Sequence, residues 1–391
     1  MKRHLLQTIL FALCGTMLLN AQTTLPDKNA SAKQEIELTV SRALAWLKTK
    51  QNPDTGAWSI PDEPAITGLV LSAFMGDLTR KLSDANLPEV EKGYKFLLSN
   101  VKPDGGIYGK GRANYNTSIV LTALVMNAKP EYQQVMLRAR KFIIGQQNDF
   151  DEKGKTDNAF DGGIGYGTPK PGAPAHADLS NTTFALEALY YSKKLFEDVG
   201  TPEDKKNDLD WGAAIKFVER CQNNKATNDQ PWASDDPKVK GGFIYEPGSS
   251  KAGEIKSADG KTALRSYGSI SYAGMLSLIY AGLTPEDPRI KAVQKWLSEN
   301  YTLDENPGMG QEGLLYYYHT MAKALAIAGA DSIETTDGKK VDWRDALSRK
   351  ILNKQRSDGS WKNDTARWME GDDVLATAYI VLALEHIYHK L

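Results

Sequence analysis

The sequence predicts an all-α protein in which six helix-pair repeats form two concentric rings of helices. A repeated pattern supports this fold class: an amphipathic helix with an aromatic-aliphatic pair near its end, a polar turn, a glycine-rich loop and a second, apolar helix. The pattern occurs six times along the chain, and uninterrupted units span about 50 residues, a period typical of repeated supersecondary units. With 41% apolar residues, the chain can also bury a large core.

The six units follow one another along almost the whole chain. Their first parts fall at 43–59, 93–109, 140–148, 214–224, 293–310 and 347–361, and their second helices at 65–76, 115–127, 179–192, 267–283, 313–329 and 372–388. Insertions at 149–178 and 223–266 interrupt the third and fourth units. The aromatic position of the first helix is held by Trp46, Phe96, Phe142, Phe217 and Trp296, and by Lys350 in the sixth unit.

The two helices of each unit differ in composition, and this difference assigns them to different rings. The first carries Lys, Arg and Glu on one side, as expected of a surface helix. The second is apolar nearly all round and rich in Ala, Gly, Ser and Thr, which predicts burial on most sides and close neighbours. The glycines allow the chain to turn with positive φ between the rings, and the following Trp or Tyr fills the space between repeats.

A closed ring of six such pairs leaves a central cavity. All inner helices then run in one direction, so that their N-termini gather at one rim, which should be electropositive and favour anionic ligands. The glycine loops and both insertions lead into these N-termini. We therefore expect the ligand site at this rim.

The N-terminus has the pattern of a secretory signal. Lys2 and Arg3 precede the apolar run 5–19, and the small residue Ala21 precedes the expected cleavage site. The run is too short to be read as a membrane span, so we expect export to the periplasm or the extracellular space.

The expected domain organisation follows from this cleavage site. We expect a signal peptide at 1–21, a flexible segment at 22–34 and a single toroidal domain at 35–391. Removal of the signal leaves only Cys221, which predicts a mature chain without an internal disulfide.

Charge and composition exclude some classes of partner. Charged residues make up 25% of the chain, with both signs mixed and a net charge of −1, so no basic surface for nucleic acid is expected. Nothing in the sequence requires a metal or an organic cofactor. Contact with a membrane surface and the oligomeric state stay open.

The repeat resembles that of the squalene–hopene cyclase and protein prenyltransferase superfamily, whose fold is the (α/α)6 toroid. The resemblance covers roughly residues 35–391. It implies this fold and, as an expectation, an activity on an isoprenoid or another apolar molecule in the central cavity. The first repeat matches the family signature at Arg42, Ala43, Trp46, Leu47, Gln51, Gly56 and Trp58, and the sixth matches at Gln355, Gly359 and Trp361.

The family's cyclases protonate an alkene with an acidic motif at the start of an inner helix, and residues 370–378 resemble that motif. Glu370, Asp372 and Asp373 stand in its acidic positions. Clustered carboxylates cannot all ionise, so one of them would keep a proton to donate. The alternative is that these acids only cap the helix.

Residues 318–320 resemble the Tyr-His-Thr segment that supplies a zinc ligand in prenyltransferase β subunits. Arg265 and Tyr267 stand where the other two ligands would be, so no zinc site is expected. His319 would then be a general acid or a hydrogen-bond donor. The rings of Tyr316, Tyr317 and Tyr318 are candidates for ligand contact through cation–π attraction, with core packing as the alternative.

Further candidates lie at the predicted rim. His176 and Asp178 precede the third inner helix, and Arg265 and Lys261 could contact an anion. Glu312, Asp178 and Arg265 could instead serve a polysaccharide-active enzyme, since such enzymes also use α/α toroids. Three functions stay open: a cyclase-like enzyme acting on an isoprenoid, a non-catalytic binding toroid, and a polysaccharide-active enzyme.

Overall fold

The computed structural model describes residues 29–79, 87–167, 176–257 and 260–391. The expected signal peptide and the apolar run 5–19 lie outside the described residues. Among the described residues, no helix is long and apolar enough to cross a membrane.

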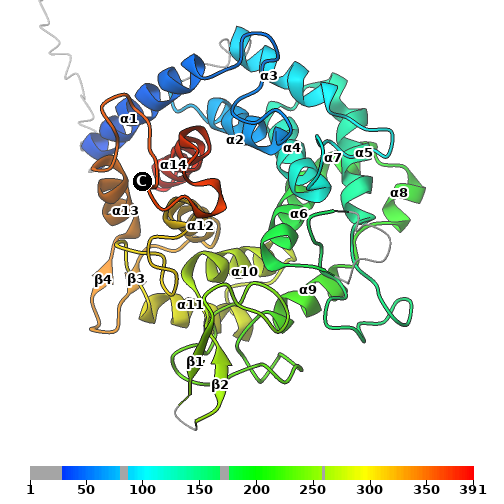
Figure 1. Ribbon diagram of the computed structural model, residues 1–391, viewed down its shortest axis with the longest axis vertical. Coiled ribbons are helices and arrows are strands. Elements are labelled where there is room, and N and C mark those ends of the chain that lie inside the picture. Colours follow the sequence, from blue (N-terminus) through cyan, green and yellow to red (C-terminus); the bar gives the residue numbers. More distant parts are fainter. Residues whose placement is uncertain (1–28, 80–86, 168–175, 258–259) are drawn as a thin grey trace, which may run out of the picture.

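Two concentric rings of helices make up the molecule, as Figure 1 shows. In the inner ring each helix contacts the next, and α14 contacts α2, so the ring is closed. The inner helices are α2 (Pro64–Met75), α4 (Ala113–Asn127), α6 (Leu179–Tyr191), α10 (Gly268–Tyr280), α12 (Leu314–Ile327) and α14 (Asp373–Tyr388). The chain is therefore all-α and toroidal, as its sequence predicts.

The outer ring consists of the first helices of the repeats, and it is closed by a contact between α1 and α13. Its helices are α1 (Ala30–Thr49), α3 (Pro88–Ser99), α5 (Gln133–Ile144), α9 (Trp211–Arg220), α11 (Pro288–Glu299) and α13 (Trp343–Leu352). Because α1 begins at Ala30, residues 30–34 are helical, whereas the sequence suggested a flexible segment there.

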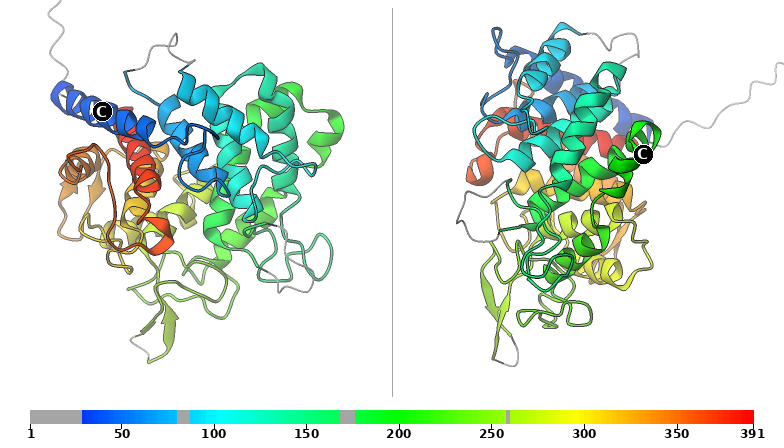
Figure 2. Two further views of the ribbon diagram at one scale, coloured as in Figure 1. Left: turned by 45° about the horizontal axis from the view of Figure 1, so that its top comes forward. Right: turned by 90° about the vertical axis from the view of Figure 1, so that its right-hand side faces the viewer.

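Short elements fill the connections between the rings. The helices α7 (Lys193–Val199) and α8 (Pro202–Lys206) follow α6, and the 3-10 turns η2 (Pro130–Tyr132) and η3 (Arg367–Met369) precede α5 and α14. Strands β1 (Glu254–Lys256) and β2 (Thr262–Leu264) form an antiparallel hairpin that projects from the second insertion, as Figure 2 shows. Strands β3 (Ile333–Glu334) and β4 (Lys340–Val341) form a second hairpin.

Small residues let the inner helices approach closely. A Cβ atom on Gly68 of α2 would lie 3.3 Å from the side chain of Ile119 in α4. On Gly274 of α10 it would lie 2.6 Å from the ring of Phe243, so a larger residue would clash there. The outer helices bury only one face, which explains why their sequences are amphipathic.

The glutamine of the Gln–Gly–Trp pattern links its repeat to the next one. The Gln51 side chain donates to the carbonyls of Gly56 (3.0 Å) and of Glu89 in α3 (2.8 Å). Gln355 makes the same pair of bonds to Gly359 and to Thr39 in α1, both at 3.0 Å, and so links the sixth repeat to the first.

Two further glutamines, in the third and fourth repeats, occupy the same position. Gln147 donates to Gly162 (3.1 Å) and to Asp210 at the start of α9 (2.9 Å). Gln222 donates to the carbonyls of Gly241 and Arg289, both at 2.9 Å. The glutamine link therefore recurs in more repeats than the complete motif does.

The turn glycine of the sixth repeat should be intolerant of substitution. Gly359 has φ +97°, and a Cβ atom there would lie 2.8 Å from the Arg42 carbonyl. We expect Gly359→Ala to lower the free energy of unfolding by about 1–3 kcal/mol in urea denaturation. Gly338→Ala is the control, because Gly338 has φ +77° but nothing within 4 Å of the added atom. Equal losses in the two variants would show that backbone strain alone matters and that the contact with α1 does not.

Candidate functional site

The main cavity lies where the N-termini of the inner helices meet. Its volume is about 420 Å³, and all six inner helices or the residues just before them contribute to its wall. Eight aromatic side chains line it: Tyr115, Tyr166, Phe184, Tyr245, Tyr267, Tyr316, Trp368 and Tyr379. Such a wall offers flat apolar faces together with several hydroxyl groups.

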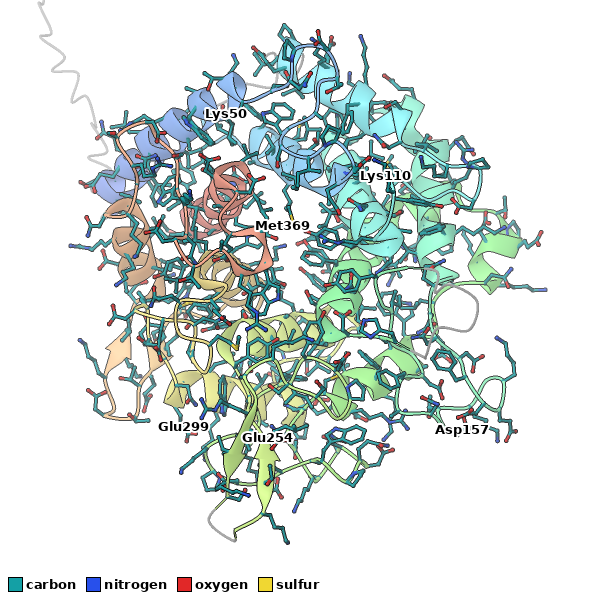
Figure 3. The ribbon with its side chains drawn as sticks, viewed as in Figure 1. Lys50, Lys110, Asp157, Glu254, Glu299 and Met369 are labelled. Atoms are coloured by element: carbon teal, nitrogen blue, oxygen red, sulfur yellow. The ribbon has the colours of Figure 1, made fainter. Side chains whose placement is uncertain are left out.

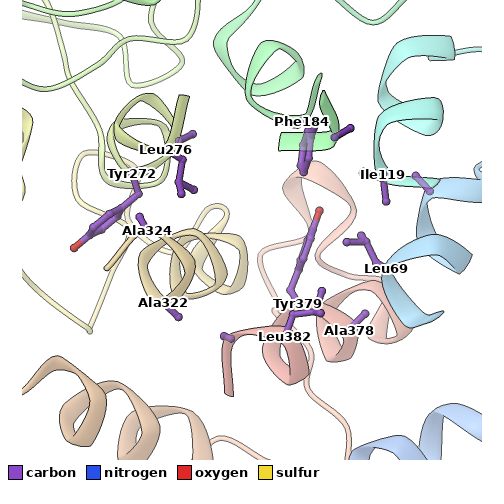
Figure 4. Packing of buried hydrophobic residues seen from close by; sticks show 14 of the residues in the cluster. Leu69, Ile119, Phe184, Tyr272, Leu276, Ala322, Ala324, Ala378, Tyr379 and Leu382 are labelled. Atoms are coloured by element: carbon purple, nitrogen blue, oxygen red, sulfur yellow. The ribbon is translucent and has the colours of Figure 1, made fainter. Parts of the chain in front are cut away.

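Four of these rings form a layer across the middle of the toroid. The ring centroid of Tyr316 lies 5.5 Å from that of Tyr379 and 6.3 Å from that of Phe184. Tyr115 packs edge-on against Phe184 with the ring centroids 5.4 Å apart. Figure 4 shows Phe184 and Tyr379 extending toward each other from facing helices. We call these four side chains the aromatic layer, and it forms the floor of the main cavity.

The two insertions supply the outer part of the wall. Tyr166 belongs to the first insertion and Tyr245 to the second, and their hydroxyl oxygens lie 3.4 Å apart. The backbone carbonyl of Tyr166 accepts from Asn114 at the start of α4 (3.0 Å), and that of Tyr245 accepts from Leu179 at the start of α6 (2.8 Å). Both insertions are thus anchored to inner-helix N-termini, as expected from their place in the sequence.

At the cavity mouth, three residues other than glycine have a positive φ, which is energetically unfavourable for them. Arg112, Trp368 and Met369 are non-glycine residues with φ of 49°, 55° and 65°, and all three line the cavity. Arg112 lies 3.5 Å from Glu63 in an ion pair, and its guanidinium lies 3.8 Å from the Met369 sulfur. Figure 3 shows Met369 beside the central opening. Backbone strain of this kind is frequent at ligand sites.

Among the described residues, Glu370 is the one acid of the predicted motif that lines the cavity. Its carboxylate is buried and accepts hydrogen bonds from the backbone N–H of Tyr316 (2.7 Å) and from the Asn363 side chain (2.6 Å). It therefore caps α12, a neighbouring helix. Burial raises the pKa of Glu370, and these hydrogen bonds oppose the rise.

Asp372 and Asp373 are not among the described residues that line the cavity, so the expected acid cluster is not assembled there. Asp372 caps its own helix: it accepts from Val374 (2.9 Å) and Leu375 (3.1 Å), and the Ser59 hydroxyl also donates to it. Asp373 is partly exposed and lies 3.8 Å from Arg356. An N-cap carboxylate must fold back onto the first turn of its helix, which turns it away from the cavity.

The three consecutive tyrosines point in different directions, since neighbours on a helix are about 100° apart. Tyr316 faces the main cavity. Tyr317 and Tyr318 donate instead to the carbonyls of Thr302 (2.9 Å) and Leu303 (2.5 Å), in the loop after α11. They are packing residues, contrary to the expectation of ligand contact. His319 lies below the aromatic layer, with its ring 5.4 Å from that of Tyr379, and lines a different cavity.

His176 and Asp178 form an ion cluster beside the main cavity. The His176 ring nitrogens lie 3.3 Å from Asp178 and 3.4 Å from Glu246, a residue that the sequence did not single out. Hydrogen bonding to these two carboxylates raises the pKa of His176 to about 9. The imidazole lies nearly parallel to the Tyr166 ring at 6.2 Å. Asp178 is fully buried and also caps α6 by accepting from Asn181 (2.9 Å).

Glu312 and Arg265 lie outside the cavity wall among the described residues. Glu312 is paired with Arg367, and Arg265 is exposed just after β2. The structure therefore does not bring Glu312, Asp178 and Arg265 together in the cavity. Glu63, Arg112 and Tyr267 do line it, each directly before an inner helix. This shared position is the sequence signal that could have identified them.

Acceptor groups of the protein itself largely offset the positive potential that the helix N-termini would create at this rim. Each inner helix donates a first-turn N–H to an acceptor of this chain. The acceptors, in the order α2, α4, α6, α10, α12 and α14, are Asn116, Tyr166, Asp178, Asn306, Glu370 and Asp372. Three of these acceptors are carboxylates, which removes much of the preference for an anion. Among the described residues, no group of three or more His, Cys, Asp or Glu could hold a metal ion.

The ion cluster predicts a pH dependence at alkaline pH. Because the folded pKa of His176 is raised above its usual 6.5, its stabilising contribution is complete below pH 6.5 and is lost as the pH rises through about 9. We expect the melting temperature of the wild type to fall toward that of His176→Gln between pH 7 and 10. An imidazole titration near 6.5 in NMR spectra would contradict this account.

Comparison with known proteins agrees with this fold. No protein-family model matches the chain, and no curated protein is detectably similar in sequence. A variant of the type II terpene cyclase MstE from Scytonema, in complex with geranylgeranyl dihydroxybenzoate, superposes with a TM-score of 0.54 at 12% identity; the match covers 93% of this chain and 100% of that chain.

A second similar structure has a different activity. The GH76A α-1,6-mannanase from Salegentibacter superposes with a TM-score of 0.56 at 11% identity, over 91% of this chain and 100% of that chain. At such identities the likeness establishes the fold and leaves the reaction open. The chain therefore has the α/α-toroid fold, which the cyclase and the mannanase share.

Proposed function

We propose that the protein binds an isoprenoid or a comparable apolar molecule in the main cavity. The observation that carries this proposal is the wall itself, with eight aromatic side chains around about 420 Å³ at the meeting point of the six inner helices. Flat apolar walls with a few polar groups are typical of small-molecule sites. A structurally similar cyclase binds geranylgeranyl dihydroxybenzoate, which makes a prenylated aromatic compound a reasonable first ligand.

We propose that the protein binds this molecule, and we favour binding over cyclase-like turnover because only one acid of the expected motif reaches the cavity. Glu370 could serve as a proton donor, since burial raises its pKa. Its oxygens are, however, engaged with α12 and Asn363. Protonation would weaken these bonds, so the helix cap favours the ionised carboxylate.

A glycan is the second candidate ligand, favoured by the polar groups of the same wall. Glu63 and Glu370 are both cavity carboxylates, and the tyrosines offer hydroxyls as well as faces for a sugar ring. Paired carboxylates are the usual catalytic groups of glycoside hydrolases. The similar mannanase supports this reading to the same degree as the cyclase supports the first.

We also propose that the protein is exported. Lys2, Arg3 and the apolar run 5–19 support this proposal. Mass spectrometry of the mature N-terminus would test it, and a chain retaining residues 1–21 would argue against it.

Ligand capture tests the proposed binding. The chain from Gln22 onward would be incubated with a total membrane-lipid extract and, separately, with manno-oligosaccharides, and bound species read by mass spectrometry. We expect an isoprenoid to be retained, and Trp368→Ala to weaken its binding roughly 3–10-fold, because Trp368 lines the cavity and is 40% exposed. Tyr190→Ala is the control, since Tyr190 is similarly exposed, at 43%, and is in the wall of neither cavity. Retention of sugars alone would favour the glycan reading.

Glu370→Gln separates binding from turnover. We expect it to lower the free energy of unfolding by about 1–3 kcal/mol, because an amide nitrogen would replace one acceptor at the start of α12. Asp373→Asn should change it by less than about 0.5 kcal/mol, since Asp373 is partly exposed. If the captured molecule is chemically altered by the wild type and only bound by a folded Glu370→Gln, then the protein is an enzyme and Glu370 is its acid.

A further inference from the structure

A second cavity lies on the opposite side of the aromatic layer, toward the C-terminal ends of the inner helices. Its volume is about 270 Å³, and its wall comes from α2, α4, α6, α12 and α14. Much of the wall is apolar, and it includes Leu69, Ile119 and Leu382, which Figure 4 shows near Phe184 and Tyr379. Of the residues that the structure describes, Phe184 alone belongs to the walls of both cavities. The second cavity is therefore a separate compartment.

The mouth of this cavity carries exposed apolar side chains. Met126 is 41% exposed and Tyr191 37% exposed, although both belong to otherwise buried helices. His389, also exposed, completes this edge. A molecule from solution can thus reach the cavity without crossing the aromatic layer.

His319 is the unusual residue of this wall. Its side chain is 1% exposed, yet neither ring nitrogen has a hydrogen-bond partner among the described residues. The Tyr379 carbonyl partly opposes the lowering of the His319 pKa, but it is not placed to form a hydrogen bond with the imidazole. Leaving a buried polar group unpaired costs about 1–3 kcal/mol, so a ligand that hydrogen-bonds to this group would be stabilised. Glu385, which is 5% exposed, presents a third unpaired atom, Oε1, in the same wall.

The charges of the wall are already balanced. The Lys323 ammonium lies 2.7 and 3.0 Å from the two oxygens of Glu187 in a buried ion pair. Burial and then the Lys323 charge lower the pKa of His319, and burial lowers that of His386 to about 3, so both rings are neutral. Burial raises the pKa of Glu385, which favours its protonated form. A charged ligand would therefore lose its hydration without gaining a free counter-charge.

We propose that this cavity is a second binding site, for an uncharged, mainly apolar molecule with a hydroxyl group that hydrogen-bonds to His319. A neutral imidazole can donate through one nitrogen and accept through the other, which suits a hydroxyl. The volume suits a molecule of about 10–12 non-hydrogen atoms, given that a cavity of about 150 Å³ holds benzene. This site is independent of the molecule held in the main cavity.

The probe is 4-butylphenol, with butylbenzene and 4-butylbenzoate as matched compounds that lack the hydroxyl or add a charge. Binding is measured by titration calorimetry, and the His319 ring nitrogens are followed by NMR. We expect 4-butylphenol to bind more tightly than either relative and to shift the His319 signals. His319→Phe should weaken 4-butylphenol about 5–10-fold, the effect of one hydrogen bond, and leave butylbenzene unchanged.

Two further variants locate the site. Thr122→Trp should block all binding there, because Thr122 lines the second cavity and a bulky indole at this position would fill much of its volume. Trp368→Ala, in the main cavity, should leave 4-butylphenol unaffected. The reverse pattern, with Trp368→Ala weakening the phenol and Thr122→Trp having no effect, would overturn the proposal, as would absence of binding.

The stability of the free variant gives an independent check. Replacing an unpaired imidazole with an apolar ring of similar shape should leave the melting temperature unchanged or raise it. A lower melting temperature of free His319→Phe, together with unchanged phenol affinity, would show that His319 is bonded within the core. That result would also overturn the proposal.

Discussion

Closure of the inner ring is the constraint on which the rest of this structure depends. The contact between α14 and α2 joins the last helix of the chain to the first inner helix, and Gln355 ties the sixth repeat to α1 through the Thr39 carbonyl. Six parallel helices in a closed ring must place six N-termini at one rim and six C-termini at the other. The positions of both cavities follow from this arrangement.

Closure of the ring also determines which hydrogen bonds the polar groups at the rim must form. Six sets of unpaired N–H groups in one place would be costly to bury, and the chain supplies an acceptor for each helix. This requirement explains why acids are abundant before the inner helices and why few of them are free for chemistry. Asp178 and Asp372 cap their own helices, while Glu370 reaches a neighbouring one. A sequence motif that looks catalytic is in this way largely structural.

The aromatic layer divides the centre of the toroid into two compartments of different character. The rim compartment is wide, and its wall is rich in tyrosine hydroxyls and includes strained residues such as Arg112 and Trp368. The opposite compartment is smaller and contains a buried ion pair and an imidazole without a partner.

The sequence alone determined the fold class and the six repeats, and it predicted the rim at which the main cavity lies. Local features suffice for this: the composition of each helix, the glycines of each turn and the order of the elements. The individual site residues depended on the tertiary structure, as Tyr316 shows beside Tyr317 and Tyr318, since a rotation of about 100° separates cavity lining from packing. Glu370 and Asp372 likewise look equivalent in the sequence. Which acceptor caps which helix, and which ring faces a cavity, is decided by neighbours far apart in the chain, and no local pattern encodes that choice.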